Sequence, residues 1–180
     1  MATLEIENLH ADVAEEGGET ILRGVDLTVD SGEIHEEEVM GVLGENGLGK
    51  TVFTKMLAGA IKPDEGSTLE TDVSYKPQRI EAKAETIQPA VPNHVNPNKK
   101  SFQTRVAGPL GLDPLMERKL TELSGGELQR VAVAICLARD ADLYLLDEPS
   151  AYLDVESRVE LGKTLKRFAR KSGKPIAVVD

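Results

Sequence analysis

The octapeptide Gly44-Glu45-Asn46-Gly47-Leu48-Gly49-Lys50-Thr51 constrains the fold of this chain more than any other stretch. It fits the pattern G-x-x-x-x-G-K-[ST], a phosphate-binding loop that joins a strand to a helix. Its glycines permit backbone turns that bring successive N–H groups onto one anion. The Lys50 ammonium suits the β- and γ-phosphates, and the Thr51 hydroxyl suits Mg²⁺. We therefore expect the octapeptide, together with Val52, to bind a nucleoside triphosphate.

The segments on either side of the octapeptide support a strand–loop–helix unit. Val39-Met40-Gly41-Val42-Leu43 predicts a buried strand. Residues 50–60 predict a helix, because apolar side chains recur there at helical spacing: Val52, Phe53, Met56, Leu57 and Ala60. A glycine-rich turn that binds no ligand is the alternative interpretation of the octapeptide.

The composition of the 180 residues is that of an ordinary globular domain, with 40% hydrophobic and 29% charged residues. The net charge of −10 opposes nonspecific attraction to nucleic acid or to an anionic membrane. A single cysteine excludes an intrachain disulfide and a four-cysteine metal site. The sequence contains no apolar run of membrane-span length and no signal-peptide pattern. We therefore expect a cytoplasmic protein that binds no nucleic acid and is not inserted in a membrane.

The pattern of apolar segments predicts an α/β fold in a single domain over residues 1–180. Alternating stretches within residues 1–38 predict an antiparallel β layer. Apolar strands that alternate with helices predict a mainly parallel sheet flanked by helices, with the nucleotide-binding core in residues 39–78 and 140–180. Six of the nine prolines fall between Pro77 and Pro114. We therefore expect a loop-rich insert with short helices to open a small helical subdomain over residues 79–139.

Two more motifs follow the proline-rich stretch. In Leu123-Ser124-Gly125-Gly126-Glu127-Leu128-Gln129-Arg130, Ser124 is suited to cap a helix. The apolar strand Leu143-Tyr144-Leu145-Leu146 ends in Asp147-Glu148-Pro149-Ser150, which places two carboxylates at the edge of a sheet. Asp147 offers the oxygen ligands that Mg²⁺ prefers, and Glu148 is suited to act as a general base on water. A charged strand end without catalytic chemistry is the alternative for this pair.

The order of these motifs resembles that of the ATP-binding cassette (ABC) ATPases. The octapeptide corresponds to Walker A, residues 123–130 to the signature motif, residues 143–149 to Walker B and residues 150–154 to the D-loop. Gln78 stands where that family has its Q-loop glutamine. The resemblance implies an ABC-type P-loop NTPase fold with ATP and Mg²⁺ as cofactors. It implies that Thr51, Gln78 and Asp147 hold the metal and that Glu148 and Gln78 are catalytic.

In that family the signature motif completes the ATP site of a second cassette. Ser124, Gly125, Gly126 and Glu127 would therefore contact ATP held by the phosphate loop of another molecule. The resemblance implies a head-to-tail homodimer, which is isologous. Because ATP supplies much of the contact, the dimer is expected to depend on nucleotide.

Two parts of the chain resemble two different groups within that family. From about residue 39 onward the sequence is similar to the second cassette of the ribosome-recycling ATPase (RNase L inhibitor) family, above all in Asp147-Glu148-Pro149-Ser150-Ala151-Tyr152-Leu153-Asp154. Residues 1–35 instead resemble a Suf-type iron–sulfur assembly ATPase, as in Leu4-Glu5-Ile6-Glu7-Asn8-Leu9-His10. We therefore expect a truncated, recombined or engineered cassette with a join near residues 32–39.

The resemblance also bears on turnover. It places a switch histidine directly after Asp180, and His10, His35 and His94 do not match that position. We therefore expect Mg-ATP binding and ATP-dependent dimerisation with slow or residual hydrolysis. The alternatives are a catalytically inactive ATP-binding and dimerising module, a transporter motor subunit and a Suf-like assembly subunit.

Overall fold

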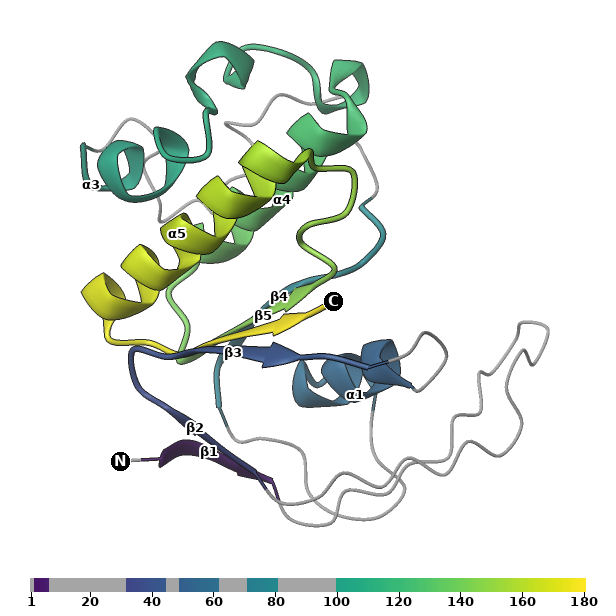
Figure 1. Cartoon of the computed structure of the whole chain (residues 1–180), viewed down its shortest axis with the longest axis vertical. Coiled ribbons are helices and arrows are strands. Elements are labelled where there is room, and N and C mark those ends of the chain that lie inside the picture. The colour runs from purple at the N-terminus through teal and green to yellow at the C-terminus, as the bar shows by residue number, and fades with distance from the viewer. Residues whose placement is uncertain (1, 7–31, 45–48, 62–70, 81–99) are drawn as a thin grey trace, which may run out of the picture.

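The computed structural model describes residues 2–6, 32–44, 49–61, 71–80 and 100–180 (Figure 1). The strands are β1 (Ala2–Ile6), β2 (Gly32–His35), β3 (Val39–Val42), β4 (Val73–Lys76), β5 (Leu143–Asp147) and β6 (Ile176–Val179). The longer helices are α1 (Lys50–Leu57), α4 (Gly125–Ala138) and α5 (Val155–Ser172). Short helical segments are α3 (Lys100–Phe102), η1 (Gln103–Ala107), η2 (Asp113–Leu115) and η3 (Leu120–Glu122).

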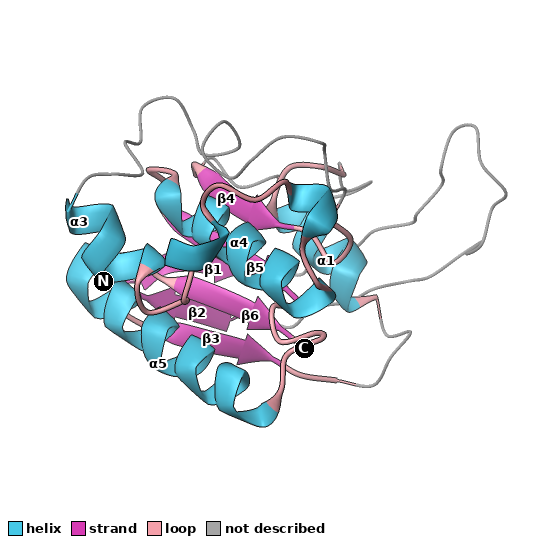
Figure 2. Ribbon diagram, turned by 90° about the horizontal axis from the view of Figure 1, so that it is seen from above, coloured by secondary structure: helices cyan, strands magenta, loops and turns pink. Residues whose placement is uncertain are grey.

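A parallel sheet of four strands, in the order β3-β6-β5-β4, lies at the centre of the fold. Figure 1 shows α4 and α5 on one face of this sheet and α1 on the other, and Figure 2 shows the strands from above. β5 is buried at every position, because it has a strand on each side and helices on both faces. The expected α/β fold, a parallel sheet flanked by helices, is confirmed.

Alternate residues of β5 belong to different halves of the core. Leu143 and Leu145 pack with Phe53 of α1 in one cluster. Tyr144 and Leu146 belong to the cluster on the other face, where the rings of Tyr144 and Phe168 meet edge to face at a centroid distance of 5.2 Å. Because side chains alternate along a strand, Asp147 follows Leu145 onto the α1 face of the sheet.

The N-terminal part of the chain adds a separate ribbon. β1 and β2 pair in antiparallel fashion, with Glu5 opposite Glu33 and Ile6 opposite Gly32. Residues 7–31 of the expected antiparallel β layer lie outside the described residues, as do residues 81–99 of the insert. No helix in the described part of the chain is long and apolar enough to cross a membrane.

The prediction that residues 39–43 form a buried strand is wrong in its burial. β3 forms as expected, but its residues are only half-buried, Gly41 is exposed, and 80% of the Leu43 surface is accessible. Within the described sheet, β3 pairs with β6 alone and forms the edge. The helix expected over residues 50–60 also ends early, at Leu57. Gly59 then takes a positive φ of 70°, which the α-helix does not allow.

The core contact of α5 gives a first prediction. Phe168 is buried against Tyr144, so Phe168→Ala removes the edge-to-face contact and leaves a cavity. We expect the free energy of unfolding, measured by urea titration, to fall by about 3–5 kcal/mol. Val159→Ala on the same helix is the matched control, because half of the Val159 surface is already exposed (51%). An equal loss in both variants would contradict the assigned packing of α5.

Candidate nucleotide-binding site

The start of α1 has the features of an anion site. Gly49 precedes the helix with a φ of 81°, a left-handed conformation that glycine adopts without strain. Among the described residues no side chain caps this helix, so its first N–H groups and its positive dipole end remain available to an anion. Lys50 donates from Nζ to the carbonyl oxygen of Gly44, which brings the two ends of the octapeptide together.

The other predicted residues of this loop differ in their surroundings. The side chain of Val52 packs against the core on the α1 face, so Val52 can serve a ligand only through its backbone. Thr51 is half-buried at the first turn of α1. The central residues Glu45, Asn46, Gly47 and Leu48 lie outside the described residues.

Asp147 presents a buried carboxylate with one oxygen left over. Its Oδ2 accepts a hydrogen bond from the Tyr75 hydroxyl at 3.3 Å. Its Oδ1 is buried and has no hydrogen-bond partner among the described residues. Burial raises the pKa of Asp147, against the nearby hydroxyls of Thr51 and Tyr75, which lower it.

A buried carboxylate oxygen without a donor is a poor end state for a protein, because the desolvated group loses its hydrogen bonds to water. A hard cation such as Mg²⁺ would supply the missing interaction, since it prefers oxygen ligands. Thr51 adds a hydroxyl beside the same carboxylate. The residues present therefore fit Mg²⁺ at the end of β5.

Glu148 and Gln78, both predicted catalytic residues, lie in hydrogen-bond contact although 70 positions separate them. Gln78 Nε2 donates to Glu148 Oε1 over 2.8 Å. Glu148 has a φ of 45°, in the left-handed region that costs a non-glycine residue roughly 1–3 kcal/mol. Its backbone N–H donates to the carbonyl oxygen of Val179 at 2.6 Å. The predicted general base is thus strained in its backbone and held from two directions.

Lys76 is a residue of this site that sequence reasoning missed. Its side chain is 1% exposed, and Nζ donates to the carbonyl oxygens of Asp147 at 2.7 Å and Glu148 at 3.2 Å. Burial lowers the pKa of Lys76 to about 8, against nearby carboxylates, first that of Asp147, which raise it. The alternation in Val73-Ser74-Tyr75-Lys76 carries the signal, because Lys76 falls on the same face as the buried Ser74.

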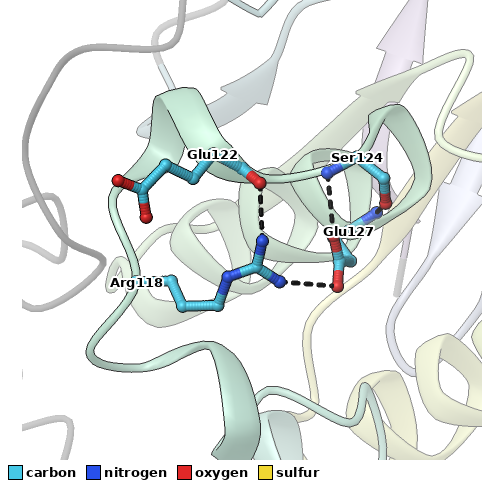
Figure 3. Close-up of polar contacts among 4 residues, drawn as sticks. All are labelled: Arg118, Glu122, Ser124 and Glu127. Carbon is cyan, nitrogen blue, oxygen red and sulfur yellow. Dashed lines mark hydrogen bonds and ion pairs between the residues drawn. The ribbon is translucent and has the colours of Figure 1, made fainter.

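The signature motif opens α4 with a reciprocal cap. Ser124 Oγ accepts from the Glu127 N–H at 3.3 Å, and Glu127 Oε2 accepts from the Ser124 N–H at 2.8 Å (Figure 3). The Ser124 hydroxyl accepts in this cap and keeps its own hydrogen to donate, since a hydroxyl has both capacities. These hydrogen bonds with Ser124 are the main cause of the lowered pKa of Glu127.

Arg118 is a second residue that the sequence did not identify. Its guanidinium lies 3.2 Å from Glu127 Oε1 and donates to the carbonyl oxygen of Glu122 at 2.6 Å (Figure 3). The positive charge of Arg118 also lowers the pKa of Glu127, although less than the cap does. Arg118 thereby holds the Glu127 carboxylate against the start of α4 and partly offsets its charge.

Tyr152 packs against both signature glycines, with its side chain on Gly125 and its backbone on Gly126. A Cβ on Gly126 would lie 2.9 Å from the Tyr152 carbonyl oxygen, and one on Gly125 would lie 3.2 Å from its Cγ. Tyr152 itself has a left-handed φ of 62°, and 80% of its surface is exposed. The close approach of backbone to backbone leaves room for glycine alone at residue 126.

The signature residues line an open cavity of about 470 Å³. Residues 124–127 and 152–154 form its walls, together with Arg130. Of the described phosphate-loop residues, none contributes to this cavity. The described residues therefore place two helix starts, those of α1 and α4, at separate sites.

The contact between Gly126 and Tyr152 can be tested with a pair of glycine variants. Gly126→Ala forces the 150–154 loop to shift, and we expect a loss of about 1–3 kcal/mol in the free energy of unfolding. Gly162→Ala in α5 is the control, because a Cβ there meets nothing within 4 Å. That change is expected to stabilise the chain by roughly 0.5–1 kcal/mol. Urea titration of both variants is the measurement, and a neutral Gly126→Ala would contradict the close approach.

Comparisons with known proteins agree with this arrangement. The sequence profile of the ABC transporter family matches residues 27–151. An uncharacterised ABC transporter ATP-binding protein of Methanocaldococcus jannaschii is 48% identical over 158 residues, which are 86% of this chain and 26% of that protein. Translation initiation factor RLI1 of Saccharomyces cerevisiae is 42% identical over 158 residues, again 86% of this chain and 26% of that protein. This chain spans about a quarter of the length of these relatives.

The fold is shared with a solved structure. The crystal structure of the archaeal ribosome recycling factor aABCE1, in complex with the ribosomal stalk protein aP1, superposes with a TM-score of 0.86 at 41% identity. The match covers 99% of this chain and 34% of that chain. The family profile spans the phosphate loop, the signature motif and the two carboxylates. This chain therefore belongs to the ABC ATPase family and contains a cassette similar to those of RLI1 and aABCE1.

Proposed function

We propose that this chain is an ABC-type nucleotide-binding domain that holds Mg-ATP at the edge of its parallel sheet. The observation that carries the proposal is the buried Asp147 Oδ1, which has no hydrogen-bond partner among the described residues and lies beside the Glu148–Gln78 pair. An anion-accepting helix start at Gly49 and Lys50 supports the same assignment. A nucleotide with its metal satisfies both features at once.

Each group has a distinct task in this proposal. The first N–H groups of α1 and the Lys50 ammonium bind the β- and γ-phosphates. Asp147, Thr51 and Gln78 would hold Mg²⁺, which when bound offsets charge on the phosphate oxygens. Glu148 orients the attacking water and accepts its proton. In the structure the Glu148 carboxylate is engaged by Gln78, so this contact must loosen before Glu148 can act.

We also propose a nucleotide-dependent head-to-tail homodimer. The Ser124 hydroxyl can donate, and the N-terminus of α4, a helix of 14 residues, offers N–H groups to phosphate oxygens. The cavity at the start of α4 is lined by none of the described phosphate-loop residues of the same chain. It can therefore contact ATP bound by the phosphate loop of a second molecule. Two copies related by a two-fold axis would form two equivalent composite sites. Hydrolysis would then be slow and would rise with chain concentration.

A catalytically inactive module that binds ATP and dimerises is the main alternative. The same binding features support it, and it differs in having no role for Glu148 as a base. The names of two relatives, a translation initiation factor and a ribosome recycling factor, favour a ribosome-linked process for a longer protein with this cassette. A transporter motor subunit and a Suf-like assembly subunit rank below the inactive module as alternatives. The Suf-type likeness of residues 1–35 and a join near residues 32–39 stay predictions.

Nucleotide binding can be measured as a thermal shift. At a free Mg-ATP concentration of about 100 Kd, binding adds about 2.7 kcal/mol to the stability of the folded state. We expect a rise in Tm of several degrees, roughly 2–4 °C for each kcal/mol in a chain of this size. Lys50→Ala should abolish the shift, whereas Lys55→Ala, which removes a lysine from the same helix, should keep it. An unaltered chain without any shift would contradict nucleotide binding.

Hydrolysis is tested separately by Glu148→Gln. This change keeps the size of the side chain and removes the base, so we expect phosphate release to fall by about 10²–10⁴-fold. The Mg-ATP thermal shift should persist, because the phosphate contacts at α1 are unchanged. Release measured at several chain concentrations also tests the dimer. The same background rate in both proteins would establish the inactive module instead.

A further inference from the structure

The strand that leads to Gln78 ends in a lysine that none of the proposed steps uses. Lys76 is 1% exposed, and lysine is almost never fully buried without partners. Its partners here are two successive backbone carbonyls, those of Asp147 at 2.7 Å and Glu148 at 3.2 Å. The ammonium therefore lies directly against the backbone that carries the predicted metal ligand and general base.

The strand register explains why these carbonyls need a donor. β4 pairs with β5 from Val73 opposite Leu143 to Lys76 opposite Leu146, and ends there. β5 continues to Asp147, which is paired with Val179 of β6 on its other side. On the β4 side, the carbonyls of Asp147 and Glu148 therefore have no strand neighbour to donate to them. The Lys76 side chain supplies the hydrogen bonds that β4 would have made, as a buried carbonyl requires.

The same hydrogen bond holds Glu148 in its left-handed conformation. The N–H of Glu148 donates to Val179 on β6, and its carbonyl oxygen accepts from Lys76 on β4. A non-glycine residue keeps a φ of 45° only where its surroundings fix it. Glu148 is therefore fixed at both of its backbone polar groups, one from each neighbouring strand, while its carboxylate meets Gln78.

We infer that Lys76 is a positioning residue, which aims the Glu148 carboxylate by fixing the backbone from Asp147 to Glu148. It acts through these residues and has no contact with the nucleotide. Gln78 follows Lys76 by two positions. The end of β4 therefore positions Gln78 directly and positions Glu148 through the Lys76 side chain. This inference rests on the proposed function, in which Glu148 is the base.

Lys76→Met is the direct test, because methionine keeps most of the apolar stem and removes the ammonium. Two carbonyls then lose their donor, and residue 148 is free to leave its left-handed conformation. We expect kcat for ATP hydrolysis to fall about 10- to 100-fold, the cost of misplacing a catalytic group by about 1 Å. KM and the Mg-ATP thermal shift should stay the same, because phosphate binding at α1 is untouched.

Ser74→Ala is the matched control. Ser74 lies on the same strand and face, is fully buried, and donates to the carbonyl oxygen of Cys136 on α4 at 2.8 Å. Its loss should lower stability and leave kcat within about twofold, as for a residue outside the transition-state contacts. An unchanged kcat in folded Lys76→Met, or an equal fall in Ser74→Ala, would overturn the inference. If Lys76→Met does not fold, Lys76→Gln, which retains one donor group, takes its place: its kcat should fall with KM unchanged, and an unchanged kcat in folded Lys76→Gln would overturn the inference.

A second readout needs no catalysis. The side-chain amide resonance of Gln78, assigned by its disappearance in Gln78→Ala, reports the hydrogen bond to Glu148. We expect this resonance to move to a solvated position in Lys76→Met and to stay in Ser74→Ala. An unmoved resonance in Lys76→Met would also overturn the inference. Failure of the proposed function would look different: without nucleotide binding the unaltered chain would show no Mg-ATP thermal shift, and without Glu148 as base it would release phosphate no faster than Glu148→Gln.

Discussion

The burial of β5 between β4 and β6 is the constraint on which the rest of the site depends. Every residue of β5 is buried, so its apolar side chains fix the strand in both halves of the core. In a parallel sheet, fixing one strand also fixes the register of its neighbours. Functional groups then collect at the carboxyl ends of the strands, as in other open α/β sheets. Lys76, Asp147 and Val179 meet at one edge for this reason.

The short connection from β5 to α5 links the end of the sheet to the signature helix and also caps α5. It begins with Glu148 in a left-handed conformation and passes through Tyr152 in another. It ends at Asp154, whose carboxylate caps α5 by accepting from the Ser157 N–H at 2.7 Å. Between these points the Tyr152 backbone contacts Gly126 of the signature helix. The end of β5, with Asp147 and Glu148, and the signature cavity are therefore joined by one strained, well-anchored segment.

Much of the fold and site could be predicted from the sequence, because the main signals are local. Apolar runs predicted β3 and β5, and Ser124 marked the start of α4 through its capping chemistry. The contacts of Lys76 and Arg118 could not be predicted, because each depends on a partner from another element. A lysine in a strand is ordinarily a solvated residue. Only the register shows that β4 ends opposite Leu146, which leaves the carbonyls of Asp147 and Glu148 for the Lys76 side chain. The burial of β3 was overestimated, because its edge position is a property of the whole sheet.

The contact between Gly126 and Tyr152 has a consequence for how such a chain can change over time. Any side chain at residue 126 meets a backbone carbonyl, which cannot rotate away as a side chain can. A tolerated substitution there requires the 150–154 connection to be rebuilt at the same moment. Yet Glu148, just before that connection, and Asp154, at its end, are each held by hydrogen bonds of their own. The two segments are therefore expected to be inherited as one unit, and a hybrid that takes them from different parents must match both.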